Sequence, residues 1–231
     1  MIEVKNLSKQ YAGTVVLDIP EMEIKKGESF GLVGNNGAGK TTFFRLILDL
    51  IRANTGSVTS NGLEVSASVE WKNYTGSYLD EGFLIDFLTP EEYFEFLADI
   101  NGLSSGDLQD FYLRFGDFFN QEVLGKNKYI RDLSAGNQQK VGIAASMIAD
   151  PKVLILDEPF NSLDPSTQIR LVRMLNEFQQ EKQITMLISS HDLNHISEVC
   201  QRIVILERGK VVHDLQKSPT TLIELEKYFA V

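Results

Sequence analysis

The sequence predicts an α/β fold: a mixed sheet flanked by helices, with an N-terminal antiparallel β subdomain and an α-helical insertion. Three observations lead to this prediction. Short alternating stretches separated by turn residues fill the start of the chain, apolar runs alternate with helical patterns later on, and an acidic, aromatic stretch lies between them. The 231 residues are enough for one sizeable core, so we expect a single domain over residues 1–231.

Strands are predicted first, over residues 2–33, where short stretches such as IEV and SFGLV alternate in polarity. Asn61-Gly62 then indicates a hairpin. A helical pattern begins near residue 83, with a helix cap at Thr89, Pro90 after it, and an aromatic stripe. We assign that stripe to a helical core rather than to a ligand site, and we place the helical insertion at about residues 83–145.

Apolar strands dominate the remaining sequence, in VLILDEP, ITMLISS and RIVILERG. Helical patterns separate them, and this alternation indicates a parallel sheet covered on both faces. A closing helix that contains Leu222, Leu225 and Phe229 is expected to pack on this core.

The net charge of −10 is concentrated in one segment. Between Asp80 and Glu122 there are eleven acids and one base, Arg114, whereas the remaining acids and bases cancel. Nucleic-acid binding needs a basic footprint, so we predict no nucleic-acid partner. We expect most of these acids to form a solvated face and some to meet a basic partner.

Cellular location is predicted from three features. No apolar run approaches the length of a membrane span, and the N-terminus lacks the apolar core of a signal peptide. The single cysteine, Cys200, cannot form an internal disulfide and fits a reducing compartment, although as a buried helix residue it would need no such explanation. We therefore expect a cytoplasmic protein.

The stretch GNNGAGKTT, Gly34 to Thr42, lies between a predicted strand and a predicted helix. Its glycines let backbone N–H groups converge on phosphate oxygens, and the helix N-terminus adds a positive dipole end. Lys40 would neutralise the β- and γ-phosphates, and the Thr41 hydroxyl would ligate Mg²⁺.

Two acids, Asp157 and Glu158, end the buried strand VLILD. Burying carboxylates there is costly unless they bind something. Asp157 would hold Mg²⁺ through water, and Glu158 would act as the general base toward the attacking water.

His191 follows another apolar strand, at the carboxyl end where open α/β sheets place their ligands. From the residues alone, a histidine that simply starts a helix beside Asp192 is the favoured interpretation.

Taken in order, several motifs resemble the nucleotide-binding subunit of an ATP-binding cassette (ABC) transporter. The sequence has Tyr11, GNNGAGKTT, SYLDEG, LSAGN, LILDEP, SLDP and SSH. The resemblance covers essentially the whole chain and implies a P-loop NTPase core that binds and hydrolyses ATP with Mg²⁺.

This resemblance implies a role for each motif residue. Tyr11 would stack on adenine, Asp164 would couple two subunits, and His191 would contact the γ-phosphate. The loop that would hold the triphosphate comprises Gly34, Asn35, Asn36, Gly37, Ala38, Gly39, Lys40, Thr41 and Thr42. Such cassettes pair head to tail, so Ser134 would donate its hydroxyl, and Gly136 its N–H, to ATP held by a partner.

Two departures from the family pattern stand out. LSAGN replaces the usual LSGGQ, and Ala135 would cost about 1 kcal/mol only if its backbone needed a positive φ. Glu81 stands where the family has a glutamine that touches Mg²⁺, and it adds a negative charge there. In an alternative alignment, Asp80 and Glu81 are both simply solvated.

We therefore expect an ATPase subunit, peripheral on the inner face of the cell membrane, that forms a homodimer and drives an integral-membrane permease. The acidic insertion with the Glu81 loop is the expected docking surface, and the short insertion favours an exporter. The alternatives are a soluble ABC-type ATPase with a regulatory, non-transport role and one acting on ribosomes or DNA.

Overall fold

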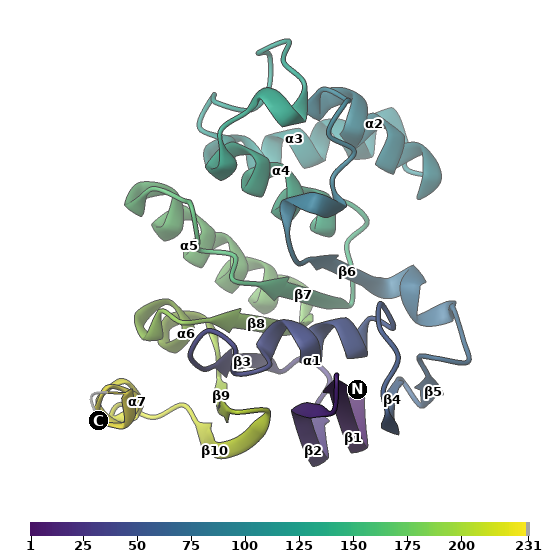
Figure 1. The fold of residues 1–231 in the computed structure, drawn as a ribbon. Coiled ribbons are helices and arrows are strands. Elements are labelled where there is room, and N and C mark those ends of the chain that lie inside the picture. Colours follow the sequence, from purple (N-terminus) through teal and green to yellow (C-terminus); the bar gives the residue numbers. More distant parts are fainter. Residues whose placement is uncertain (230–231) are drawn as a thin grey trace.

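A computed structural model describes residues 1–229, and for Glu81 it describes the backbone but not the side chain. Two sheets lie beside one another, with a group of helices beyond the larger sheet (Figure 1). The smaller sheet has the order β2-β1-β4-β5 and is antiparallel throughout. Its strands are β1 (Ile2–Tyr11), β2 (Thr14–Ile24), β4 (Thr55–Ser60) and β5 (Leu63–Glu64). The predicted N-terminal antiparallel subdomain is confirmed, and Asn61-Gly62 joins β4 to β5.

The larger sheet has six strands in the order β10-β9-β3-β8-β7-β6. Its strands are β3 (Ser29–Val33), β6 (Thr75–Tyr78), β7 (Val153–Asp157), β8 (Thr185–Ser190), β9 (Arg202–Glu207) and β10 (Lys210–Gln216). Five of them run parallel, and β10 pairs antiparallel at the edge, so the sheet is mixed as predicted. Every residue of β3, β7 and β8 is buried, because helices or the other sheet cover both faces.

Between β6 and β7 the chain forms three helices, α2 (Pro90–Ile100), α3 (Ser105–Phe119) and α4 (Ala135–Met147). Thr89 and Ser104 start α2 and α3 with capping boxes. The predicted aromatic stripe is confirmed as core, since its rings pack within the same cluster as the sheet's inner face: Phe94, Phe111, Phe115, Phe118 and Phe119. This packing joins the insertion to the apolar core of the larger sheet.

Four further helices complete the chain: α1 (Lys40–Ile47), α5 (Pro165–Lys182), α6 (Leu193–Val199) and α7 (Thr221–Phe229). Short 3₁₀ turns occur at η1 (Glu70–Tyr74), η2 (Glu81–Phe83) and η3 (Ile130–Asp132). Leu225 of α7 is fully buried, which confirms that the closing helix packs on the core. No helix within residues 1–229 combines the length and the apolar character needed to cross a bilayer.

Candidate functional site

The carboxyl ends of three neighbouring parallel strands meet at one edge of the larger sheet. There β3 leads into the loop Gly34–Gly39, β7 ends at Asp157, and β8 ends at Ser190. Parallel strands place their carboxyl ends together, so side chains that follow them in sequence converge here. The sequence-predicted residues of these three motifs are all found at this edge.

The loop Gly34–Gly39 turns sharply into α1. Gly39 has φ 109°, and a Cβ on it would lie 2.9 Å from the Val16 carbonyl oxygen, so only glycine fits. Gly209 also holds the loop, because its N–H donates to the Ala38 carbonyl at 2.9 Å. Within residues 1–229 no side chain caps the start of α1, so its first N–H groups face outward as donors for an anion.

Lys40 is the first residue of α1, and its side chain is only 7% exposed. Its Nζ donates to the Gly34 carbonyl at 2.7 Å and lies 3.1 Å from Glu158 Oε1. The ammonium group is therefore folded back over the loop, where it can neutralise a bound phosphate.

Glu158 lies between Lys40 and His191. Its Oε2 accepts the His191 backbone N–H at 3.2 Å and lies 2.8 Å from His191 Nδ1. The Glu158 side chain is 20% exposed and the imidazole is 58% exposed, so this carboxylate can reach a water molecule at the mouth of the site. The structure thus brings together the three residues predicted to be catalytic.

Asp157 lies deeper, and its two oxygens are both engaged. Thr41 Oγ1 donates to Oδ2 at 2.5 Å, and the Ser189 hydroxyl donates to Oδ1. Burial raises the pKa of Asp157, although the hydrogen bonds from Ser189 and Thr41 oppose the shift. Magnesium prefers one or two protein oxygens together with phosphate and water, and Thr41 and Asp157 fit that donor set. The residues described contain no cluster of three or more His, Cys, Asp or Glu arranged for a metal.

The remaining residues of the predicted triphosphate loop differ in exposure. Asn35, Asn36 and Gly37 are exposed, Ala38 is buried, and Thr42 is half-buried as the third residue of α1. Tyr11 ends β1 with 48% of its surface exposed, and Lys9 Nζ lies 5.0 Å from its ring centre. An exposed ring of this kind is available for stacking, and the predicted contact with adenine stays a prediction.

Helix α4, which begins in the LSAGN segment, lies on the opposite side of β7 from α1 (Figure 1). Ser134 caps α4 by accepting the Asn137 N–H at 3.3 Å. Ala135 has ordinary helical backbone, so its methyl group causes no strain of the kind considered above. Within the described chain, no hydrogen bond or ion pair joins Ser134 or Gly136 to the loop Gly34–Gly39. This chain alone therefore does not bring the two predicted phosphate contacts together.

Gly136 has a structural reason to be glycine. A Cβ there would lie 2.5 Å from the carbonyl oxygen of Ser162, in the loop after β7. The start of α4 is thus packed directly against backbone that follows Glu158.

Asp164, predicted to couple two subunits, caps its own helix α5. It accepts hydrogen bonds from the N–H and hydroxyl groups of both Ser166 and Thr167. These bonds hold the pKa of Asp164 well below its usual range. Its role toward a second subunit stays a prediction.

The loop SYLDEG follows β6. Asp80 Oδ2 lies 3.5 Å from Arg45 of α1, and Asp80 Oδ1 accepts the Gly82 N–H at 2.9 Å. Asp80 is therefore paired rather than simply solvated. The side chain of Glu81 lies outside what the structure describes, so its predicted contact with Mg²⁺ stays a prediction.

Sequence reasoning missed two polar residues that touch the site. Ser189 accepts the Glu158 N–H at 2.9 Å and donates to Asp157, and Gln139 donates to the Glu158 carbonyl at 3.2 Å. Ser189 could have been identified from the sequence, because it is a small polar residue at the end of an apolar strand. Gln139 could not, because its partner is distant in sequence.

Comparison with known proteins identifies the family. Residues 17–161 match the family model described as ABC transporter. The chain is 34% identical to the methionine import ATP-binding protein of Carboxydothermus hydrogenoformans, over 93% of this chain and 66% of that protein. It is 33% identical to the bacitracin transport ATP-binding protein of Enterococcus faecalis, over 94% of this chain and 70% of that protein.

A solved structure has the same fold. The dimeric structure of a bacterial ABC transporter cassette matches with a TM-score of 0.84 at 25% identity, over 94% of this chain and 99% of that one. The chain therefore belongs to the ABC transporter family and carries the ATP-binding, ATP-hydrolysing cassette of that family.

Proposed function

We propose that the chain is the ATP-hydrolysing subunit of an ABC transporter, which pairs head to tail with a second copy around two ATP molecules and drives a membrane permease. The observation that carries this proposal is the position of Glu158, whose carboxylate meets both Lys40 and His191 beside Asp157 and Thr41. A general base next to a lysine-bearing phosphate loop is the arrangement that ATP hydrolysis requires.

In the proposed reaction, Lys40 and the N–H groups at the start of α1 hold the β- and γ-phosphates. The Glu158 carboxylate takes a proton from water as the water oxygen bonds to the γ-phosphorus and the bond to the bridging oxygen breaks. His191, already bonded to Glu158, would orient that carboxylate and contact the γ-phosphate. Thr41 and Asp157 would hold Mg²⁺, which neutralises charge on the phosphates.

The site would be completed by the second copy. Ser134 and Gly136 lie apart from the loop of their own chain, as a head-to-tail arrangement needs. The Ser134 hydroxyl uses an acceptor lone pair to cap α4, so its hydrogen remains free to donate to a phosphate. Asp164 would lie at the subunit boundary, and the dimeric cassette of the same fold supports this pairing.

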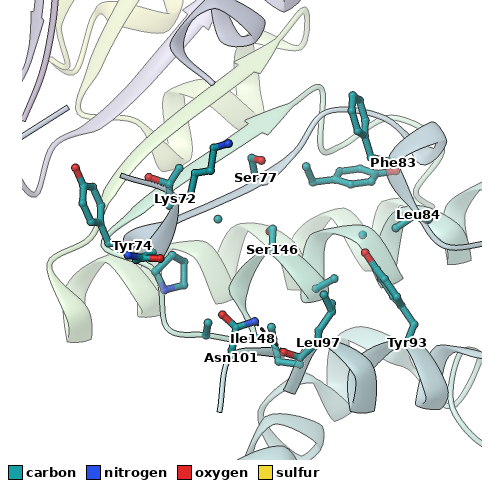
Figure 2. A pocket seen from close by; sticks show the side chains of 18 residues that line it. Lys72, Tyr74, Ser77, Phe83, Leu84, Tyr93, Leu97, Asn101, Ser146 and Ile148 are labelled. Atoms are coloured by element: carbon teal, nitrogen blue, oxygen red, sulfur yellow. Dashed lines mark hydrogen bonds between the residues drawn. The ribbon is translucent and has the colours of Figure 1, made fainter. Parts of the chain in front are cut away.

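A groove beside the insertion is the proposed contact with the permease. It has a volume of about 230 Å³ and lies between β6, η1 and helices α2 and α4. Figure 2 shows Phe83 and Tyr93 at one end and Lys72 and Tyr74 at the other. Phe83 is 53% exposed, and α2 beside it carries four acids (Glu91, Glu92, Glu95 and Asp99). We propose that a basic, amphipathic cytoplasmic helix of the permease docks here and holds the chain on the inner face of the membrane.

For the direction of transport, we keep export as the proposal. The short insertion supports it, whereas the methionine import relative would favour the opposite direction. The name of the bacitracin transport relative gives no direction.

Steady-state ATP hydrolysis by the purified chain tests the function. Glu158→Gln removes the base and should lower kcat by about 100-fold or more, while ATP still binds. Glu177→Gln, the same change on an exposed face of α5, should leave kcat unchanged. Equal activity of the wild type and Glu158→Gln would contradict the proposed role of Glu158. A wild type that binds ATP without hydrolysing it would favour a regulatory subunit instead.

A further inference from the structure

Gln139 connects α4 to the backbone of Glu158. It lies on the buried side of α4 with 7% of its surface exposed, and its Nε2 donates to the Glu158 carbonyl oxygen at 3.2 Å. The acceptor is a carbonyl, so the amide must present its NH₂ group to it. The bond therefore joins the helix that begins at LSAGN to the residue proposed as the general base.

The backbone of Glu158 is in an unusual conformation that needs such support. Its φ is 49°, in the left-handed region, which for a residue other than glycine costs about 1–3 kcal/mol and persists only where neighbours hold it. Three groups do so. Ser189 Oγ accepts the Glu158 N–H at 2.9 Å, and the Glu158 carbonyl accepts from the Asn161 N–H and from Gln139, each at 3.2 Å.

Helix α4 contacts both ends of the loop from Glu158 to Ser162. Gln139 bonds to Glu158 at one end, and Gly136 leaves no room for a side chain against Ser162 at the other. Ser162 also has a left-handed backbone, with φ 58°. The conformation of this loop therefore depends on the position of α4. The orientation of the Glu158 carboxylate depends on it as well.

Two other glutamines show that this contact is specific to Gln139. The adjacent Gln138 donates to the Leu133 and Arg131 carbonyls, within the segment before its own helix. Gln179, 9% exposed in α5, donates to the Gly27 carbonyl at 2.9 Å. Gln179 is thus a buried glutamine with the same kind of bond, placed elsewhere in the core.

We propose that Gln139 is a positioning residue for hydrolysis, which holds the Glu158 peptide so that the carboxylate meets the attacking water. Ser134 lies five residues before Gln139, about 7.5 Å along the helix axis. The first turn of α4 would contact the ATP bound by the partner, and the same helix holds Glu158, the proposed general base of its own chain, in position. A shift of α4 on dimer closure would change both sites together. This inference rests on the proposed function.

The test compares Gln139→Met with Gln179→Met. Both changes keep side-chain volume and remove one amide donor, so we expect similar small decreases in melting temperature. Gln139→Met should lower kcat about tenfold or more with the KM for ATP within about twofold, because a misaimed base slows chemistry rather than binding. Gln179→Met should keep the wild-type kcat. Gln139→Glu, which has the same shape but cannot donate when ionised, should repeat the loss.

Amide hydrogen exchange gives a readout that does not depend on activity. Exchange in the segment 158–162 should be faster in Gln139→Met and unchanged in Gln179→Met. Wild-type kcat and wild-type exchange in Gln139→Met would overturn the inference and leave the proposed function standing. Equal losses in both variants, with KM rising, would overturn it as a general stability effect. A wild type that hydrolyses no ATP would contradict the proposed function, and the exchange comparison would then decide on Gln139 alone.

Discussion

The chain contains two helix starts that are suited to phosphate, and they are built in opposite ways. At α1 the preceding residue is Gly39, whose left-handed backbone carries no side chain, so the first N–H groups have no side-chain acceptor. At α4 the preceding residue is Ser134, which has extended backbone and caps the helix itself. The first start is completed by an anion, whereas the second is complete without one and keeps a hydroxyl hydrogen to donate.

The largest expected effect on ATP hydrolysis comes from two variants, one altered at the start of α1 and the other at the start of α4. Lys40→Ala should lower kcat/KM for ATP about 100-fold, and Ser134→Ala about tenfold, because each removes a donor aimed at developing charge. Head-to-tail pairing of the two variants gives one doubly altered site and one intact site. A 1:1 mixture should then recover roughly a quarter of the wild-type rate, because half of randomly paired dimers are mixed.

Each variant alone is the control at the same total concentration and should show only its own reduced rate, at most about a tenth of the wild-type rate for Ser134→Ala. A mixture with no recovery would contradict the proposal that one ATP contacts the starts of α1 and α4 from two different chains. Both helix starts would then act within one chain, or would not act in hydrolysis.

A medium effect is expected at Gly136. Gly136→Ala places a methyl group against the Ser162 carbonyl and should lower the free energy of unfolding by about 1–3 kcal/mol. The matched control is Gly116→Ala in α3, where nothing lies within 4 Å of an added Cβ. That change should stabilise the protein by up to about 1 kcal/mol, since alanine is the better helix former. Urea unfolding measures the free energy of unfolding of both variants. Equal changes would show that α4 is not closely packed against the loop that contains Ser162.

The smallest effect is expected at Ala135. Ala135→Gly restores the usual family residue at an exposed position with helical backbone, so kcat should change by less than about twofold. The free energy of unfolding should fall by under about 1 kcal/mol, because glycine is the poorer helix former. A large rise in kcat would mean that the alanine methyl obstructs the contact with the partner's ATP.

The loop Gly34–Gly39 with Lys40, the acids Asp157 and Glu158, and His191 could be predicted from sequence. Each follows an apolar strand, and parallel strands bring their carboxyl ends to one edge. The contacts of Gln139 with Glu158 and of Gly136 with Ser162 could not be predicted. They depend on how closely α4 approaches a loop about twenty residues away, and no periodicity or motif spacing encodes that approach. The Asp80–Arg45 pair was also missed, because it joins α1 to the loop after β6 and no motif spacing links the two.

The packing around Gly39 also links ligand binding to folding. Val16 limits the space beside Gly39, and Gly209 donates to Ala38, so three segments spread over almost the whole chain shape one short loop. Contacts so distant in sequence form only when most of the chain is in place. ATP held by this loop therefore binds the complete fold in preference to partly folded forms, and it shifts the folding equilibrium toward the native state by mass action.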